Sequence, residues 1–576
     1  RSMLGHGEQE RKLSEFQLEA TRSILREEAN TRGVIVSAGT GAGKTLAFYL
    51  PALLDIADWV EKDDYWVKAV ALYPRVELLK DQFSEAFRLI RSMDSVMIAA
   101  GKRPIILGSF FGSTPSQATR ESARNAGWTD SGKGYICPYL SCPECSKNMI
   151  WLNEDLDKGL QRLTCINQPI CSGEATKDQI SLIKGSGRKT DTPPDISFTT
   201  TESLNSRISD IPRRYKFGIS HAPQKRVRLI LLDEIHTYSG TSGAHAALLL
   251  RRWFWAIGQS VRVVGLSATL DEPVDFFHQL TGIDPHNIDH IFPNEESLTS
   301  GSMEYQLLLM ADPASRASLL STTIQTTFLL ARLLDQMQSE NVAEKQSKTH
   351  GRFGSKMFVF TDDLDMINRL YDDLMNAEGT RYKIPDEPPL ALLRSDNNDD
   401  PTARDRHGQN WRSIERFGRD LRTPLRISRT SSQDTGVELG SEVIVATASL
   451  EVGFDDPAVG AVIQHKAPYG LAAFAQRKGR AGRPISMRPW MVTVLSDYGR
   501  DRLAFQSYDK YLDVVVPPQV LPVHNRYLLR MQAVFAFIDW LASDDVSENH
   551  WGWWWQALDG PASGWVKADI EKLQST

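Results

Sequence analysis

The chain has 576 residues, of which 41% are hydrophobic and 24% are charged. This length predicts three or four domains with enough apolar material for buried cores. Sixty-six basic and 72 acidic side chains give a net charge of −6, so any nucleic-acid surface must be local. No run of about 18 apolar residues could span a membrane, so no membrane partner is expected. All five cysteines fall between Cys137 and Cys171, which excludes a disulfide scaffold and favours a reducing, cytoplasmic location.

Short apolar runs alternate with amphipathic helices along most of the chain. In the first half these runs lie at 33–36, 69–72, 105–107, 228–232 and 261–264. After a polar gap near 339–355 they resume at 357–360, 390–393, 443–445, 461–463 and 491–495. Near-continuous apolar strands between helices indicate parallel sheets covered on both faces. We therefore predict an α/β fold with domains at 1–310 and 311–515, followed by a helical, Trp-rich segment at 516–576.

Residues 33–45 read GVIVSAGTGAGKT, which is a strand, a glycine-rich turn and the start of a helix. In this context backbone N–H groups of the turn can point at phosphate oxygens. The residues that would form this cradle are Gly39, Thr40, Gly41, Ala42 and Gly43. Lys44 would reach the β- and γ-phosphates of ATP, and the Thr45 hydroxyl would bind Mg²⁺. Ala38 stands where the usual pattern has its first glycine.

Two carboxylates, Asp233 and Glu234, follow the apolar run Val227–Leu232. Ligands of an open α/β sheet bind at the carboxyl ends of its strands, where these side chains would lie. Phosphoryl transfer to water needs one carboxylate to hold Mg²⁺ and another to orient or deprotonate the water. We assign Asp233 to the first role and Glu234 to the second. Standing alone, such a pair would more often be an exposed strand end.

Six further motifs occur in the order typical of one family. They are Phe16-Gln17, Tyr73–Leu78, Thr199–Glu202, Ser267-Ala268-Thr269, Ala446–Asp455 and Gln476–Arg483. Together with Lys44 and Asp233 they resemble the motifs of the superfamily 2 DEAD/DEAH-type helicases, from about residue 13 to 500. The resemblance implies two tandem RecA-like domains with ATP bound in the cleft between them.

The same resemblance implies roles for residues outside the phosphate loop. Gln17 would read the adenine, and Asp455 would contact the ribose or couple the domains. Gln476 would contact the γ-phosphate or the attacking water. Arg480 and Arg483 would act as arginine fingers, because a guanidinium is always charged and its planar fork stabilises the equatorial oxygens of the transition state.

The stretch Thr237–His245, followed by a helix ending in Arg251-Arg252, resembles the MrfA/YprA-like branch of bacterial DNA-repair helicases. It is also similar to helicase subunits of anti-phage systems, such as the DrmA-like subunit of DISARM and DpdJ-like proteins. This implies an ATP-dependent DNA helicase or translocase, moving 3′ to 5′ on a single strand or a duplex with a single-stranded end. The alternatives are an RNA-dependent DEAD/DEAH ATPase and an ATP-gated scaffold subunit of a defence complex.

The cysteines lie in an insertion at 133–191 that has few strand signals. Cys142-Pro143-Glu144-Cys145 has the spacing of a zinc knuckle, and Cys165 and Cys171 follow twenty residues later. Structural Zn²⁺ takes four tetrahedral thiolates, often in a small unit without its own core. We predict Zn²⁺ bound by these four residues, with Cys137 as an alternative ligand. An iron–sulfur cluster and free thiols are the alternatives, and the insertion is expected to touch DNA.

Two features of the C-terminal part suggest a protein partner. MrfA-type chains end in a four-cysteine module, but no cysteine follows Cys171 here, so we expect a partner subunit to supply one. Five tryptophans lie between Trp551 and Trp565. Such a cluster can stack on bases, but packing in a small subdomain or a partner interface is the commoner use.

Overall fold

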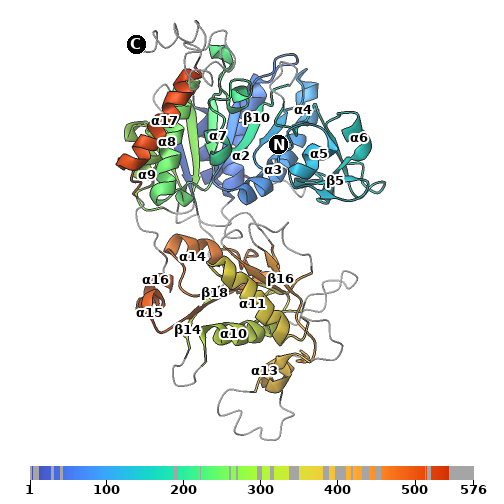
Figure 1. Ribbon diagram of the computed structural model, residues 1–576, viewed down its shortest axis with the longest axis vertical. Coiled ribbons are helices and arrows are strands. Elements are labelled where there is room, and N and C mark those ends of the chain that lie inside the picture. The colour runs from blue at the N-terminus through green and yellow to red at the C-terminus, as the bar shows by residue number, and fades with distance from the viewer. Residues whose placement is uncertain are drawn as a thin grey trace, which may run out of the picture. The chain divides into compact units, whose positions relative to one another are not determined.

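The computed structural model describes most of the chain (Figure 1). The described residues are 3, 12–26, 32–38, 43–185, 192–220, 222–258, 261–267, 270–294, 301, 303–311, 317–336, 349–380, 388–395, 410–416, 419–430, 440–447, 456–512, 514 and 520–543. The chain divides into two compact units, residues 1–298 with 517–576, and residues 299–516. Among the described helices, none is both long enough and apolar enough to cross a membrane.

The first unit is built on eight parallel strands in the order β13-β1-β12-β11-β2-β10-β3-β9. They are β1 (Gly33–Ser37), β2 (Ala69–Tyr73), β3 (Leu107–Phe110), β9 (Ile180–Ser181), β10 (Ile196–Thr200), β11 (Leu229–Leu232), β12 (Arg262–Ser267) and β13 (Ile288–Ile291). Strands β1, β2 and β11 are buried along their whole length. The apolar runs therefore lack polar alternation because helices cover both faces of the sheet.

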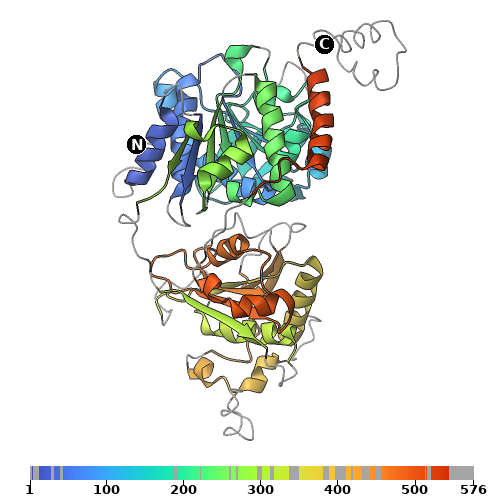
Figure 2. The same ribbon diagram turned by 90° about the vertical axis from the view of Figure 1, so that its left-hand side faces the viewer.

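The helices of the first unit include four long ones, α2, α3, α8 and α17. The helices are α1 (Glu15–Leu25), α2 (Lys44–Trp59), α3 (Val76–Arg91), α4 (Asp94–Ala99), α5 (Arg120–Asn125), α6 (Asn153–Asp157), α7 (Thr201–Asn205), α8 (Gly240–Ile257), α9 (Pro273–Thr281) and α17 (Arg526–Leu541). Short 3-10 turns are η3 (Arg214–Phe217), η4 (Pro223–Lys225), η5 (Ile235–Thr237) and η6 (Pro285–Asn287). Both views show α17 lying beside α8 (Figures 1 and 2).

The second unit has six parallel strands in the order β14-β19-β18-β15-β17-β16. They are β14 (Tyr305–Met310), β15 (Lys356–Phe360), β16 (Ile427–Thr430), β17 (Val443–Ala446), β18 (Val459–His465) and β19 (Trp490–Leu495). Its helices are α10 (Leu319–Leu333), α11 (Leu364–Ala377), α13 (Arg412–Arg416), α14 (Leu471–Lys478), α15 (Gly499–Gln506) and α16 (Asp509–Leu512). The predicted α/β class with two parallel sheets is confirmed.

Two expectations for the second unit differ from the structure. The unit begins at Thr299 rather than at residue 311, because β14 pairs with β19 and so belongs to the second sheet. The run 390–393, predicted as a strand, is part of a 3-10 helix, η9 (Leu390–Arg394). Of this run Ala391 alone is buried, while Leu390 and Leu393 are 56% and 60% exposed. The run follows two prolines and lacks the burial on both faces that a strand inside a parallel sheet requires.

The cysteine-rich insertion contains more structure than its sequence indicates. Its five antiparallel strands are β4 (Thr129–Asp130), β5 (Gly134–Ser141), β6 (Asn148–Leu152), β7 (Arg162–Cys165) and β8 (Glu174–Thr176). We call residues 129–176 the cysteine unit. Trp151 is fully buried and its ring centroid lies 5.6 Å from that of Trp128, so the unit has a small aromatic core of its own. The expectation of few strands and no core is therefore wrong.

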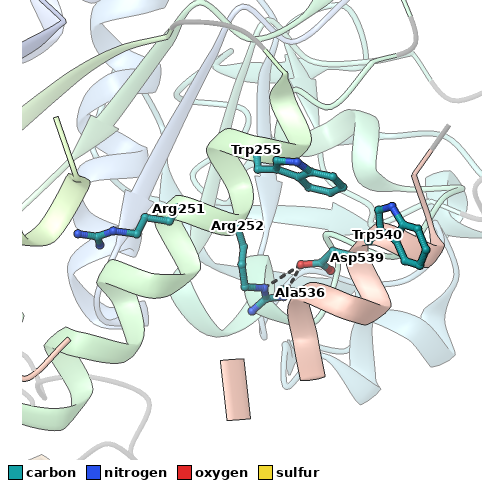
Figure 3. Close-up of a pocket in the computed structure, with 6 residues that line it drawn as sticks. All are labelled: Arg251, Arg252, Trp255, Ala536, Asp539 and Trp540. Carbon is teal, nitrogen blue, oxygen red and sulfur yellow. Dashed lines mark hydrogen bonds and ion pairs between the residues drawn. The ribbon is translucent and has the colours of Figure 1, made fainter. Parts of the chain in front are cut away.

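The chain returns to the first unit after its second sheet. The described part of 516–576, expected as a separate segment, clusters with the first unit through α17. The buried guanidinium of Arg252 on α8 holds this helix, donating to Asp539 at 2.8 Å (Figure 3) and to Gln532 at 2.9 Å, and it also donates to Asn205 of α7 at 2.7 Å. Arg214 Nη1 also donates to the carbonyl of Ala542 at 2.5 Å, just beyond the end of α17. A polar network therefore attaches the returning helix.

Burial raises the pKa of Asp539 to about 6, although the Arg252 guanidinium opposes this rise. The carboxyl therefore binds a proton more tightly in the folded than in the unfolded chain. This contribution to stability is complete below about pH 4 and is lost as the pH rises through about 6. Asp539→Asn should remove this titration. The variant should gain on the order of 3 kcal/mol relative to the parent between pH 4 and 7.

This difference in free energy of unfolding can be measured by unfolding the protein in urea at several pH values. Hydrogen exchange of the first sheet then reports the unfolding of the first unit. Asp58→Asn, at an exposed position on α2, is the matched control and should leave the pH profile unchanged. Parallel profiles for the parent and Asp539→Asn would contradict the assignment.

Candidate nucleotide site and cysteine cluster

The carboxyl ends of β1, β12 and β11 bring predicted site residues together. Gly43 caps α2 in the left-handed conformation, with φ +76°, and Lys44 is the first residue of the helix. Lys44 Nζ lies 3.4 Å from the carbonyl oxygen of Ser267, the last residue of β12. Thr45 follows half-buried in the first turn of α2. The predicted phosphate-binding lysine therefore lies at the sheet edge where ligands of such folds bind.

Some predicted residues of this loop cannot be placed. Gly39, Thr40, Gly41 and Ala42, together with Asp455 of the second unit, lie outside the described residues. The helix that begins at Lys44 is oriented with its N-terminus at the sheet edge, where its backbone N–H groups and dipole favour an anion.

Gln17 lies against the end of the loop. Its Nε2 donates to the carbonyl of Gly43 at 3.1 Å, while its Oε1 accepts the N–H of Ser14 at 3.0 Å in the capping box of α1. A Cβ on Gly43 would lie 2.6 Å from this Nε2, and the positive φ also favours glycine there. The glutamine therefore fixes the last residue of the loop, and its contact with adenine stays a prediction.

Asp233 and Glu234 follow β11 directly, as predicted. Asp233 is 2% exposed, and its Oδ1 accepts the backbone N–H of Glu234 at 2.8 Å. Burial and then the charge of Glu234 raise the pKa of Asp233 well above its usual value, while Lys44 opposes this shift. The two carboxylates are thus held where a bound cation would strongly favour their charged forms.

His236 orients the second carboxylate. Glu234 has a left-handed backbone conformation, with φ +47°, and its Oε2 lies 3.2 Å from Nδ1 of His236. Burial lowers the pKa of His236, so its imidazole is neutral near pH 7. The Oγ of Ser267 lies 3.5 Å from the same nitrogen. His236 therefore connects Glu234 to the end of β12.

Two buried tyrosines lie beside the carboxylates, and sequence reasoning missed their pairing. The hydroxyl groups of Tyr49 on α2 and Tyr73 on β2 hydrogen bond to each other. Burial is the largest cause of the raised pKa of both, and the charge of Asp233 adds to it. Tyr73, expected in a nucleic-acid motif, is fully buried, so any contact from this motif must come from its neighbours.

The second unit brings Gln476, Arg480 and Arg483 together at the end of α14 and in the turn that follows. All three are half-buried. The turn is tight, because the N–H of Gly482 donates to the carbonyl of Val459 at 3.1 Å. A Cβ on Gly482 would lie 2.5 Å from Pro489 Cγ, and φ is +75°. Only glycine therefore lets the turn that carries both arginines pack this closely.

Arg477 and Lys478 in the same motif have structural contacts instead. Arg477 is 1% exposed, donates to Gln464 at 2.6 Å and pairs with Asp362. Lys478 Nζ lies 2.9 Å from a carboxylate oxygen of Glu304. These two positions hold α14 on its sheet.

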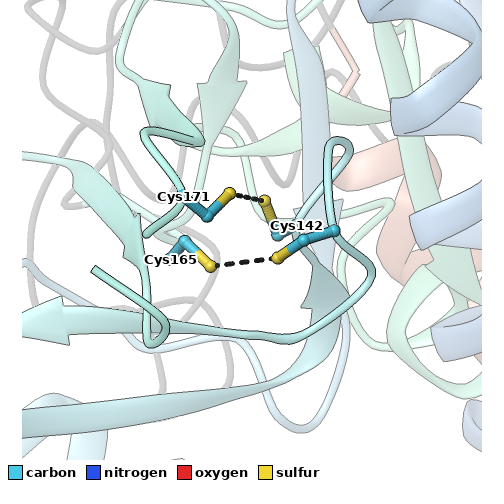
Figure 4. Close-up of side chains that lie close together, drawn as sticks. Cys142, Cys165 and Cys171 are labelled. Carbon is cyan, nitrogen blue, oxygen red and sulfur yellow. Dashed lines mark hydrogen bonds between the residues drawn. The ribbon is translucent and has the colours of Figure 1, made fainter. Parts of the chain in front are cut away.

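The four predicted ligand cysteines form one cluster. The Sγ atoms of Cys142, Cys145, Cys165 and Cys171 all lie within 4.8 Å of one another. Cys142 and Cys171 are 3.6 Å apart and Cys145 and Cys165 are 3.3 Å apart (Figure 4). A backbone N–H of Lys147 is the largest cause that lowers the pKa of Cys145 to about 7, which favours its thiolate.

Cys137 and Gly173 bear on which atoms form the cluster and how tightly they pack. Cys137, the alternative ligand, is not part of this group and lies buried in β5, where burial raises its pKa to about 12. A Cβ on Gly173 would lie 2.3 Å from Cys142 Sγ, so only glycine fits beside the sulfurs. The N–H of Cys165 also donates to the Gly173 carbonyl at 2.9 Å.

Two helicase family models match this chain, one in each of its two units. The DEAD/DEAH box helicase family matches residues 14–120 and 152–277. The helicase conserved C-terminal domain matches residues 433–484. The gap in the first match falls largely on the cysteine unit.

Two curated relatives match about half of this chain. Druantia protein DruE of Escherichia coli is 25% identical over 315 residues, 47% of this chain and 17% of that protein. The Lhr helicase/probable uracil glycosylase of Mycolicibacterium smegmatis is 27% identical over 310 residues, 51% of this chain and 17% of that protein. The match thus spans less than a fifth of each relative.

Two solved structures share the fold. The Mycobacterium smegmatis helicase Lhr bound to ssDNA and AMP-PNP superposes with a TM-score of 0.55 at 19% identity, over 91% of this chain and 51% of that one. The DUF1998 helicase MrfA bound to DNA superposes with a TM-score of 0.50 at 16% identity, over 92% and 52%. Both helicase domains match in the order that the motifs predict, so the chain carries a DEAD/DEAH box helicase domain followed by a helicase conserved C-terminal domain.

Proposed function

We propose that this chain is an ATP-dependent DNA helicase or translocase that moves 3′ to 5′. The observation that carries the proposal is the group of Lys44, Asp233, Glu234 and His236 at one sheet edge. A lysine at a helix N-terminus and two adjacent carboxylates are what nucleotide hydrolysis requires. The fold-level likeness to Lhr and MrfA, both solved with DNA, supports DNA as the nucleic acid.

The residues present fit a bound Mg²⁺. Burial, and then the charge of Glu234, raises the pKa of Asp233, and a divalent cation there would favour the charged forms of both carboxylates. Asp233 and the Thr45 hydroxyl would hold the ion, which would neutralise phosphate charge. Lys44 would bind the same phosphates, and the glycine-rich turn would offer them backbone N–H groups, as its sequence predicts.

Glu234 is the general base in this proposal. It accepts a proton from the attacking water, and the contact with His236 at 3.2 Å holds its carboxylate in place. Gln476, Arg480 and Arg483 act on the γ-phosphate, with the two arginines as fingers that stabilise transition-state charge. Gln17 contacts the adenine, and Asp455 contacts the ribose or couples the domains, as the family resemblance implies.

The biological setting proposed is bacterial DNA repair or anti-phage defence, in the cytoplasm. A partner subunit that carries a cysteine module, as the resemblance to MrfA-type chains implies, is part of the proposal. The substrate is a single DNA strand or a duplex with a single-stranded end.

Glu234→Gln should keep ATP binding and lower DNA-stimulated turnover about 100-fold or more, because the amide keeps the size of the side chain but cannot take a proton. Steady-state ATPase rates and nucleotide binding by equilibrium dialysis measure the two effects separately. Glu61→Gln, at an exposed position, is the matched control.

The same assay tests the nucleic acid when single-stranded DNA and RNA of one sequence are compared. Stronger stimulation by DNA, with faster displacement of a strand from a 3′-tailed than from a 5′-tailed duplex, is the expected result. Equal or stronger stimulation by RNA would favour an RNA-dependent ATPase. Normal turnover by Glu234→Gln would remove Glu234 as the base.

Gln17→Ala should raise KM for ATP about tenfold and change kcat less, because the contact that fixes Gly43 is lost and each tenfold costs about 1.4 kcal/mol. Two controls on the same helix isolate this contact. Ser14→Ala removes the N-cap but keeps the Gln17 side chain, and Glu19→Ala changes an exposed position. An equal rise in KM for Ser14→Ala would show that helix capping, rather than the Gln17–Gly43 bond, is responsible.

We also propose that the four cysteines bind one structural Zn²⁺. Four thiolates around Zn²⁺, each about 2.3 Å from the ion, lie about 3.8 Å apart. The Sγ atoms, all within 4.8 Å of one another, fit one ion better than a cluster of several irons, whose ligands must lie farther apart. The metal is structural in this proposal because all four ligand positions come from protein.

Gly173→Ala should lower the affinity of the cysteine cluster for Zn²⁺ at least tenfold, because its Cβ would overlap Cys142 Sγ. Metal content by atomic absorption and the thiolate charge-transfer spectrum of the Co²⁺ form are the measurements. Gly112→Ala is the matched control, since a Cβ there meets nothing within 4 Å. Iron and inorganic sulfide in the purified protein would contradict zinc, and unchanged zinc affinity in Gly173→Ala would contradict the packing argument.

A further inference from the structure

Helix α17 buries two polar side chains against its neighbour. The face against α8 carries Gln532 and Asp539, which are 6% and 5% exposed and bound to Arg252. Gln532 Nε2 also lies 3.0 Å from Nδ1 of His245. In an ordinary surface helix the apolar stripe faces the core and the polar residues face water. Here Leu528, which is 7% exposed, is buried as well, but Arg252 makes the principal polar contacts to α17, and most of the large apolar side chains of the helix stay exposed.

The opposite side of the helix, which we call the outer face, is apolar and exposed. Its large side chains are Tyr527, Leu529, Met531, Val534 and Phe537, with exposed fractions from 42% to 67%. Scattered apolar residues are normal on surfaces, but a continuous apolar patch marks a surface that is covered by protein. The charged groups at its N-terminal end, Arg526 and Arg530, are both basic.

A hollow of about 340 Å³ continues the outer face toward α8. It is lined by Arg251, Arg252, Trp255, Ala536, Asp539 and Trp540. Figure 3 shows the Trp255 and Trp540 rings on two sides of it and the Arg252–Asp539 pair below, while the Arg251 side chain points away. Trp255 is 54% exposed. The hollow is therefore an apolar recess between two indoles, a shape that suits one more aromatic ring.

One part of this chain has matching chemistry and starts where α17 stops. Residues 544–576, which lie outside the described residues, follow Ser543 at the end of the helix. They contain five of the chain's 14 tryptophans, and six acidic against two basic side chains. Aromatic residues match the outer face and its recess, and the acidic excess matches Arg526 and Arg530. A direct tether raises the local concentration of such a segment to the millimolar range.

We propose that residues 544–576 dock on the outer face of α17 and place an indole in the recess between Trp255 and Trp540. The docked segment covers the large apolar side chains that α17 leaves exposed, and so completes the first unit. This inference concerns the C-terminal segment alone and does not depend on the nucleotide chemistry proposed above.

Thiol labelling of the full 576-residue chain tests the proposal. Val534→Cys places a thiol on the outer face, and Leu503→Cys places one on α15, where the native side chain is 65% exposed. The zinc-loaded parent, with its five native cysteines, gives the background rate with a maleimide. We expect Val534→Cys to react at least tenfold more slowly than Leu503→Cys. Replacing Trp553, Trp554 and Trp555 together by Ser should raise the rate at position 534 to that of the control.

Three outcomes would overturn the proposal. Equal labelling of the two cysteines would show that the outer face is uncovered. Protection that grows with protein concentration would show that a second copy of the chain covers it. Protection that survives the triple tryptophan substitution would show that another part of the molecule covers it. Circular dichroism of each variant verifies that the fold is kept.

Discussion

Two adjacent carboxylates at the end of one strand are the constraint on which the site depends. The carboxyl of Asp233 is buried, and its pKa is raised by burial and by the charge of Glu234. Two adjacent carboxylates, one of them buried, raise the free energy of the folded state unless positive charge lies close to them. Lys44 at the start of α2, the neutral His236 beside Glu234 and the first turn around Thr45 are arranged about this pair. Lys44 and Thr45 come from the start of α2 and His236 from the turn that follows β11, and the parallel sheet brings these two segments together.

The sequence predicted correctly that Lys44, Asp233 and Glu234 lie at the ends of strands in the first unit, because the signals are local. A strand, a glycine turn and Lys44 are contiguous, and so are β11 and Asp233-Glu234. The four cysteines were also identified, since two hooks at fixed spacing are a local pattern. The contact of Gln17 with Gly43 was not predicted, because it joins residues 26 apart through the packing of α1. The pairing of Tyr49 with Tyr73 likewise arises only when α2 packs on the sheet.

The elements that were assigned wrongly share one physical explanation. An apolar run in a sequence does not show which other segment it pairs with or packs against. The run 390–393 has the composition of a strand, yet only Ala391 is buried and the run forms a 3-10 helix. Residues 305–310 were assigned to the first domain, yet β14 pairs with β19. The return of α17 to the first unit could not be inferred either, because Arg252 and Asp539 lie 287 positions apart. Pairings at such distances depend on topology, which a single sequence does not display.

A row of packed aromatic rings connects the cysteine unit with the end of β2, the strand next to β11 in the first sheet. Ring centroids are 5.7 Å apart between Tyr73 and Phe198, 5.3 Å between Phe198 and Phe83, and 5.3 Å between Phe83 and Tyr139 of β5. Hydrogen bonds add to this contact, because Ser84 on α3 accepts the N–H of Ser141 at 2.9 Å and donates to the Tyr139 carbonyl at 3.2 Å. Close-packed rings leave little freedom for α3 to shift alone. The strand β5 that leads into the cysteine cluster is therefore packed against α3, which begins at Val76, three residues after Tyr73.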